Sequence, residues 1–306
     1  ASLNTLVNKN RQSSINKYLG SIRDGASSSL YLQVTGTPQA ILLQTVGSGW
    51  HPLFTHYFKP GKGYLGGDFF FPKSRKAECV TYLDTLDHAE RNVVIRHLLV
   101  SAQILASGGP VSNCLIHPSV RQAAHQRFAY SIISELNWCK EKLPFKQLFE
   151  YIANHLLNDE SKVIVMNGKS DVDSDEYSFG CNFVVGGNTL GRGVTFPRLQ
   201  TIYYTRTSKK PQADTMWQHS RMFGYDRDPG MMMIYIDERL YKLFADINAT
   251  NNSIISQVEQ GLDDVKVYYP DGLNPTRKNV LDTDHVTAIS GGTNYYPFHP
   301  NNDTID

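Results

Sequence analysis

The stretch TMWQHSRMFGYDRDPG, residues 215–230, combines residue types that could bind the phosphate of a nucleotide. Gln218 and Arg221 are spaced i and i+3, which places them on one face of a predicted helix. Gly224 is expected to end that helix, and Arg227 then returns toward the same edge. Two converging guanidinium groups suit the negative charge that develops on a γ-phosphate during its transfer. The alternative is that both arginines pair with nearby carboxylates such as Asp214, Asp226 or Asp228.

A second stretch, GGNTLGRGVTF at residues 186–196, is rich in glycine and follows a predicted strand. Glycines at the carboxyl end of a strand let the backbone approach a ligand closely, and their N–H groups can face a phosphate. The stretch is also compatible with a tight strand-to-helix turn that carries an incidental arginine, Arg192. Because residues 215–230 follow it closely in the sequence, we interpret the two stretches as parts of one site.

The composition is that of a globular protein with a sizeable core, since hydrophobic residues make up 41% of the chain. The 30 Lys and Arg residues nearly balance the 29 Asp and Glu residues, so the overall charge neither predicts nor excludes a nucleic-acid partner. The four cysteines are far apart and form no CxxC pair, which favours reduced thiols in a cytoplasmic protein. No apolar run is long enough to suggest a membrane span, and we expect no membrane partner.

Apolar runs bounded by polar turns alternate with helical patterns, which predicts an α/β fold with a mainly parallel sheet. The expected strands are residues 31–34, 112–119, 162–167, 182–187, 199–206 and 231–237. The expected helices are residues 4–24, 88–106, 120–137, 145–157 and 214–223. Beyond residue 250 the pattern weakens, and the tail is rich in Asn, Asp, Thr and Tyr.

Two other patterns are incomplete. The segment Asn167-Gly168-Lys169-Ser170 resembles the end of the phosphate-binding pattern GxxxxGK[ST], but Val163 stands where the first glycine is required. The ten histidines show no ligand pair at helical spacing with an acidic neighbour. We therefore expect no metal held by this chain alone.

Taken together, RGVT and QHSRMFGYDR resemble motifs five and six of a superfamily-two helicase-like ATPase. TGTP at residues 35–38 resembles motif three, and IHPS at residues 116–119 stands where motif four is expected. The sequence of these segments resembles more closely the Z-one domain of restriction-associated bacterial ATPases. That family has close parallels to GGNTLGRGVTF, DTMWQHSRMFGYDR and PTRKNVLD (residues 275–282), and the resemblance extends in the right order over nearly the whole chain.

The resemblance implies a RecA-like fold, in which a parallel sheet carries helices on both faces, with a helical insertion and an irregular C-terminal extension. The implied division is residues 1–60 as the end of a first RecA-like domain, 61–110 as a helical insertion or linker, 111–247 as a second RecA-like domain and 248–306 as the extension. The breaker Gly108-Gly109-Pro110 marks the expected boundary before the second domain.

The resemblance also implies roles at a nucleotide site. Arg221 and Arg227 would be the arginine fingers, and Gln218 would help to orient them. The spacing departs from the commoner QxxGRxGR pattern, which leaves open which arginine reaches the γ-phosphate. The turn that links the nucleotide cleft to the DNA would be formed by Gly187, Asn188, Arg192, Gly193 and Thr195.

A further set of residues is implied to lie along a nucleic acid. Thr35 and Thr37 belong to this set and would also couple hydrolysis to domain movement. The nucleic-acid backbone would lie near His117, Ser119, Thr205 and Arg206.

The implied function is that of the carboxyl-terminal part of a DNA-dependent ATPase or translocase from a bacterial restriction or defence system. Its cofactors would be ATP and Mg²⁺, and its partners DNA and a nuclease domain or subunit. The phosphate-binding lysine loop and the acidic box of such ATPases are absent from this sequence, so we expect a fragment that starts just after the acidic box and is inactive alone. The alternative is a non-catalytic module on a RecA-like fold that binds DNA or docks a nuclease.

Overall fold

The computed structural model describes residues 14–43, 50–142, 151–168, 172–191, 194–208, 210–262, 265–270 and 272–276. The chain divides into two compact units. The first, here called the sheet unit, comprises residues 60–208 and 219–245. The second unit comprises residues 1–59, 209–218 and 246–306.

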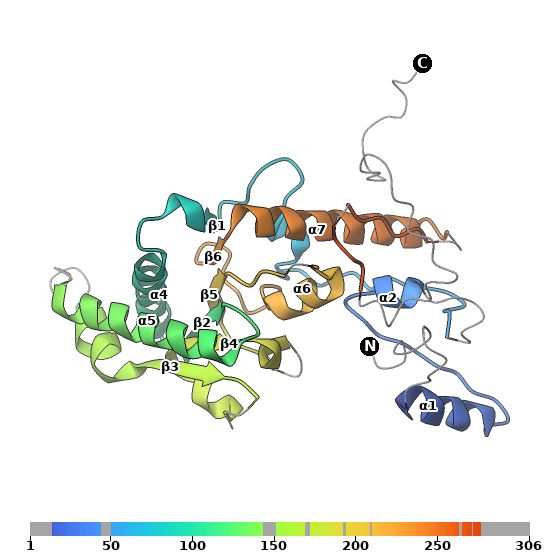
Figure 1. Ribbon diagram of the computed structural model, residues 1–306, viewed down its shortest axis with the longest axis horizontal. Coiled ribbons are helices and arrows are strands. Elements are labelled where there is room, and N and C mark those ends of the chain that lie inside the picture. The colour runs from blue at the N-terminus through green and yellow to red at the C-terminus, as the bar shows by residue number, and fades with distance from the viewer. Residues whose placement is uncertain are drawn as a thin grey trace, which may run out of the picture. The chain divides into compact units, whose positions relative to one another are not determined.

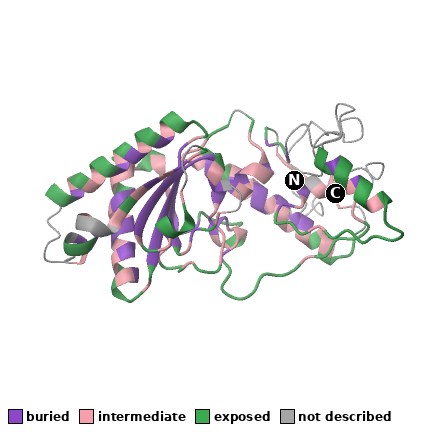
Figure 2. Cartoon of the chain, turned by 90° about the horizontal axis from the view of Figure 1, so that it is seen from below, coloured by how far each residue is buried: buried purple, intermediate pink, exposed green. Residues whose placement is uncertain are grey.

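The sheet unit is built on six parallel strands in the order β1-β6-β5-β2-β4-β3 (Figure 1). The strands are β1 (Val80–Tyr82), β2 (Val111–His117), β3 (Ser161–Met166), β4 (Gly180–Gly186), β5 (Leu199–Tyr204) and β6 (Met233–Ile236). Every residue of β2 and β5 is buried, as the purple strands of Figure 2 show. Strands buried on both faces favour apolar residues, and the runs 114–116 of β2 and 202–204 of β5 carried that signal in the sequence. The expected α/β class with a parallel sheet is confirmed.

One face of the sheet is covered by α4 (Ala89–Ala106) and α5 (Gln122–Lys142), which lie side by side in Figure 1. The π-helix η3 (Ile152–Glu160) packs with them. Between these helices and the strands lies the main apolar core, which includes Cys114, Ile116, Phe183 and Val185. The helix α4 ends where Gly108 adopts a φ of +85°, and the next amide, that of Gly109, donates to the Ile104 carbonyl at 2.9 Å.

The opposite face of the sheet is covered in part by α7 (Glu238–Glu259), whose first half belongs to the sheet unit. The Phe244 ring stacks on Phe71 at 5.4 Å between centroids and meets the Tyr204 ring edge-on at 5.3 Å. The neighbouring Tyr203 points the other way, and its hydroxyl donates to Glu90 of α4 at 3.1 Å. This alternation along β5 is the two-residue period of a strand, and it confirms helices on both faces.

The remaining helices are short, apart from α1. They are α1 (Ser14–Asp24), α2 (Gln39–Leu42), α3 (Gly67–Phe70), α6 (Ala213–Ser220) and the 3₁₀ turns η2 (Leu83–Thr85), η4 (Ser174–Tyr177) and η5 (Asn188–Gly191). Among the described residues no helix is both long and apolar enough to cross a membrane. All four cysteines are buried and free.

Several elements differ from the expectations drawn from the sequence. Residues 31–34 form no strand, and Leu32 and Val34 are exposed. The strand β1 and the helix α7 were not predicted. Because β1 and α4 belong to the sheet unit, the boundary expected at residues 108–110 lies inside it.

Candidate functional site

The glycine-rich turn after β4 is packed too tightly for side chains at its first two positions. A Cβ on Gly187 would lie 2.7 Å from both the His125 ring and the Ser119 carbonyl oxygen. A Cβ on Gly186 would lie 2.7 Å from the Met166 carbonyl oxygen. Both distances are shorter than carbon atoms tolerate, so the sequence needs glycine at each position for steric reasons. The structure therefore brings Gly187 against Ser119, which follows β2.

Arg221 lies beside this turn. Its Nε donates to the carbonyl oxygen of Leu190, within η5, at 2.6 Å. Its Nη2 is buried and has no hydrogen-bond partner among the described residues. Burial lowers the pKa of this guanidinium from its ordinary value, the direction expected when a cation loses water. Arg221 thus carries a partly buried positive charge with no carboxylate partner in the part of the chain that the structure describes.

The backbone at Arg221 explains why α6 ends before it. Arg221 has a φ of 55°, in the left-handed backbone region that residues other than glycine rarely adopt. The helix therefore stops at Ser220, and the expectation that Gln218 and Arg221 share a helical face is wrong. Non-glycine residues in this conformation cost free energy and occur often at functional sites.

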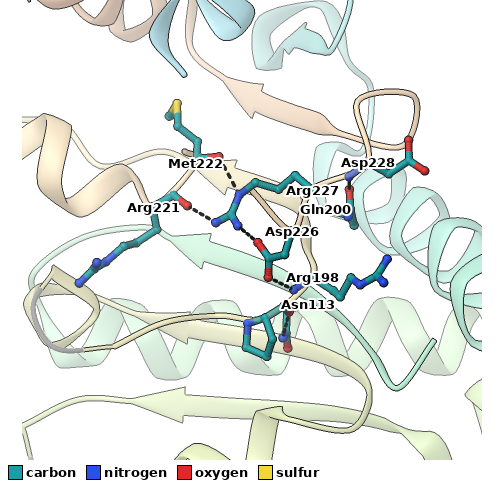
Figure 3. A network of polar contacts seen from close by, with 9 residues as sticks. Asn113, Arg198, Gln200, Arg221, Met222, Asp226, Arg227 and Asp228 are labelled. Carbon is teal, nitrogen blue, oxygen red and sulfur yellow. Dashed lines mark hydrogen bonds and ion pairs between the residues drawn. The ribbon is translucent and has the colours of Figure 1, made fainter. Parts of the chain in front are cut away.

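Arg227 is held in a different way, by a set of contacts here called the loop clamp: Arg198, Arg221, Met222, Asp226 and Arg227 (Figure 3). Arg227 forms an ion pair with Asp226, and its Nε and Nη2 donate to the carbonyl oxygens of Met222 and Arg221, each at 2.9 Å. The Asp226 carboxylate also accepts the backbone N–H of Arg198 at 2.7 Å. Only 7% of the Arg227 side chain is exposed. Gly224 leaves the space that the guanidinium fills, since a Cβ there would collide with it.

The two guanidinium groups do not converge. Figure 3 shows the Arg221 side chain leading away from the Arg227 guanidinium, which faces the backbone of its own loop. The simpler alternative, a pairing with a local carboxylate, therefore holds for Arg227 and Asp226. No residue type signals the carbonyl contacts in advance, because every residue carries the same backbone acceptor.

A second polar group, here called the switch-point cluster, contains His117, Arg206 and His219. His117 ends β2, Arg206 follows β5, and His219 lies in the last turn of α6. Arg206 Nη1 lies 2.7 Å from Nδ1 of His219 and 3.5 Å from Nε2 of His117. Burial, followed by the charge of Arg206, lowers the pKa of His117 well below its ordinary value. Because a guanidinium has only donors, the two ring nitrogens that face Arg206 accept its hydrogen bonds. Sequence reasoning missed His219, although it stands inside the QHSR stretch.

The second unit brings together three other predicted residues. Gln218 Nε2 donates to Thr37 Oγ1 at 2.8 Å, and the Thr37 amide donates to Thr35 Oγ1 at 3.0 Å. The hydroxyl contact crosses 181 positions of the sequence, so it links TGTP to the QHSR stretch within one unit.

The other predicted residues are less informative. Asn188 and Thr195 are exposed, and Thr205 is half-buried with its amide donating to the His117 carbonyl oxygen at 3.2 Å. Arg192 and Gly193 lie outside the described residues, as does most of residues 275–282. Within the described part of the chain, no group of three or more His, Cys, Asp or Glu side chains could hold a metal ion.

Comparison with known proteins bears on the same segment. Residues 138–267 match the family model of the Z1 domain. The matched segment contains the whole glycine-rich turn and the whole loop clamp. Ser119 and His125, which pack against the turn, lie before it. TGTP at residues 35–38 and IHPS at residues 116–119 lie before it. No curated protein and no solved structure matches the chain.

Proposed function

We propose that this chain is the part of a DNA-dependent, helicase-like ATPase that supplies the arginine finger, and that Arg221 is that finger. One observation carries the proposal: Arg221 holds a buried Nη2 without a partner among the described residues, directly beside the glycine-rich turn. A buried donor left unpaired costs free energy, and such groups in native proteins call for an explanation. A γ-phosphate would supply the missing acceptor and negative charge.

Arg227 takes a positioning role in this proposal. Its Nη2 holds the carbonyl oxygen of Arg221, and its Nε holds that of Met222. These bonds fix the backbone on the carboxyl side of Arg221, where the φ of 55° has to be maintained. The motif would therefore use one arginine to reach the nucleotide and the other to keep the first in place.

The residues of this chain fit one side of a bound ATP. ATP with its Mg²⁺ supplies the phosphoryl group and the bridge between the β- and γ-phosphates. Arg221, which is bonded to Leu190 of the neighbouring turn, would contact the γ-phosphate. The sequence contains no GxxxxGK[ST] pattern, so residues outside this chain would hold the β-phosphate and the metal.

DNA would be the polymer on which the ATPase acts. Ligands of parallel α/β sheets bind outside the carboxyl ends of the strands, where the predicted residues Ser119, Thr205 and Arg206 lie. We further propose a cytoplasmic, restriction-associated setting and a nuclease domain or subunit as partner, on the resemblance of GGNTLGRGVTF and DTMWQHSRMFGYDR to the Z-one ATPases.

The test is DNA-stimulated ATP hydrolysis by the full-length protein that carries these residues. The variant Arg221→Ala is expected to lower turnover by roughly 10³-fold, as the loss of an arginine finger does. Arg221→Lys should also fail, because a point charge does not replace the planar fork. The control is Arg198→Ala, which removes an exposed guanidinium whose loop contact is made by its backbone. Equal turnover in the wild type and in Arg221→Ala would refute the assignment.

The second candidate function is a non-catalytic module that binds DNA or docks a nuclease. It is favoured by the absence of the phosphate-loop pattern from this sequence. The same protein distinguishes the two. A wild type that hydrolyses no ATP with any DNA, yet binds DNA in a fluorescence anisotropy titration, would be such a module.

A further inference from the structure

The carboxyl ends of β2 and β5 lie next to each other at the point where the connections of the sheet diverge. His117 of β2 pairs with Tyr204 of β5, and the strand order places β4 on one side of β2 and β5 on the other. The chain leaving β2 enters α5, which covers one face. The chain leaving β5 reaches α6, whose His219 packs against His117 on the other face. A crevice at such a point is the usual ligand site of an open parallel sheet.

Arg206 lies at this point, and only one nitrogen of its guanidinium forms hydrogen bonds. Both hydrogen-bond contacts are made by Nη1, to His219 and to His117. The Nε and Nη2 groups have no partner among the described residues and are not among the buried unsatisfied atoms, so they keep contact with solvent. These two N–H groups form the edge of the guanidinium that binds the two oxygens of an anion in parallel.

The charge of Arg206 is also uncompensated. Burial lowers the pKa of its guanidinium, and no carboxylate pairs with it in the part of the chain that the structure describes. His117 adds a second unsatisfied group, because its Nδ1 is buried without a partner among those residues. A polar cluster that is built into the sheet and lacks an anion is therefore incomplete until one binds.

We propose that Arg206, whose Nη1 is held by ring nitrogens of His117 and His219, binds a phosphate group through its free Nε–Nη2 edge at the carboxyl ends of β2 and β5. This inference rests on the proposed function for the source of the phosphate, which is the backbone of DNA. The planar N–H pair matches two oxygens of a phosphate. None of the described carboxylates pairs with it, so the edge stays available for such a ligand. The site is separate from that of Arg221, which contacts Leu190 instead.

The two histidines are positioning residues. His219 Nδ1 accepts a hydrogen bond from Arg206 Nη1 and turns the opposite edge of the guanidinium outward. An asparagine side chain can place an acceptor oxygen close to the position of Nδ1, whereas leucine cannot. His219→Asn should therefore retain phosphate binding and His219→Leu should lose it, a difference that loss of packing alone would not produce.

The experiment measures binding by the full-length protein without ATP, so that hydrolysis plays no part. The probes are a fluorescein-labelled single-stranded 20-mer, read by anisotropy, and inorganic phosphate and ADP as competitors. Arg206→Gln is expected to weaken binding of the oligonucleotide by about tenfold and to reduce the slope of log affinity against log salt by about 0.7, the value for one phosphate contact. The matched control is Arg198→Gln, which removes the same charge just before the other end of β5.

Each outcome decides the proposal. Loss of oligonucleotide affinity in Arg206→Gln alone assigns the phosphate to a nucleic acid, and loss of competition by ADP or inorganic phosphate alone assigns it to a small phosphate; both support the site. Equal affinities of the Arg206→Gln and Arg198→Gln variants for all three probes would overturn it, as would a wild type that binds none of them. Because ATP turnover is not measured, failure here leaves the role of Arg221 standing, and failure of Arg221 leaves this site standing.

Discussion

The loop clamp and the switch-point cluster both hold a partly or fully buried arginine in the sheet unit, but they treat its charge differently. Arg227 meets the Asp226 carboxylate and two carbonyl oxygens, and its side chain is 7% exposed. Arg206 meets two imidazole rings and no carboxylate among the described residues. The first arginine has its hydrogen-bond needs met by the protein, whereas the second keeps one edge free.

The difference indicates what each arginine is for. A guanidinium whose donors are taken up by its own loop stabilises that loop and has little left for a ligand. A guanidinium whose charge is left without an anion lowers stability, and a ligand that carries negative charge offsets that loss. Arg221 resembles Arg206 in this respect, because only its Nε is bonded while Nη2 is buried and unpaired among the described residues.

The largest effect on stability is expected for the loop clamp. Arg227→Leu removes three hydrogen-bond contacts of a buried side chain and leaves Asp226 without its cation. The free energy of unfolding, measured by urea denaturation, should fall by about 3 kcal/mol, because the hydrogen bonds of a buried charged group to two carbonyl oxygens and a carboxylate are lost.

The control for this variant is Arg198→Leu, which changes an exposed side chain in the same network and should stay within about 0.5 kcal/mol of the wild type. If Arg227→Leu were as stable as Arg198→Leu, the contacts of Arg227 would not stabilise the fold, and the contrast with Arg206 would not hold.

The two regions should also respond differently to acid, because the switch-point cluster contains the buried ring of His117 and the loop clamp contains no histidine. His117 has a pKa well below the ordinary value, mainly because it is buried. The unfolded state then binds the proton at higher pH than the folded state, so stability is full above about pH 6.5 and is lost as the pH falls below it. For a histidine that stays neutral in the folded protein, the loss between pH 7 and pH 5 is about 2 kcal/mol.

The measurement compares urea denaturation at these two pH values in the wild type and in His117→Leu. The wild type should lose about 2 kcal/mol more than the variant. His97, a buried residue of α4 whose pKa is lowered to about 3 by the loss of water, remains in both proteins and contributes equally to each. The variant His56→Ala, which removes an exposed ring, is the control for the substitution of a histidine elsewhere in the chain. Parallel losses in the wild type and His117→Leu would show that His117 is not held neutral.

The sequence predicted five of the six strands, including the edge strand β3, and missed the three-residue edge strand β1. The apolar runs of β2 and β5 were found because both faces of each strand are buried. Residues 31–34 have a similar pattern but form no strand, since an apolar run becomes a strand only where a neighbouring strand accepts its hydrogen bonds. The helix α7 was missed because Asn248, Asn251 and Asn252 in its middle favour helices weakly, and burial of residues such as Phe244 compensates.

The site was predicted in its residue types more than in its contacts. The glycines at positions 186 and 187 were identified because close packing after a strand requires them. The convergence of Arg221 and Arg227 was wrong, because the left-handed backbone at Arg221 ends α6 and redirects the loop. The residue type alone does not distinguish an arginine that bonds to carbonyl oxygens from one whose donors remain available for a ligand.

The smallest effect on stability is therefore the most informative. Arg206→Leu removes a cation that has no anion among the described residues, so the free energy of unfolding at pH 7 should change by no more than about 0.5 kcal/mol, in either direction. Urea denaturation of Arg206→Leu beside Arg227→Leu tests this directly. A loss of about 3 kcal/mol in both would mean that Arg206 stabilises the fold as Arg227 does. A loss in Arg227→Leu alone would mean that the carboxyl ends of β2 and β5 hold their arginine for a ligand.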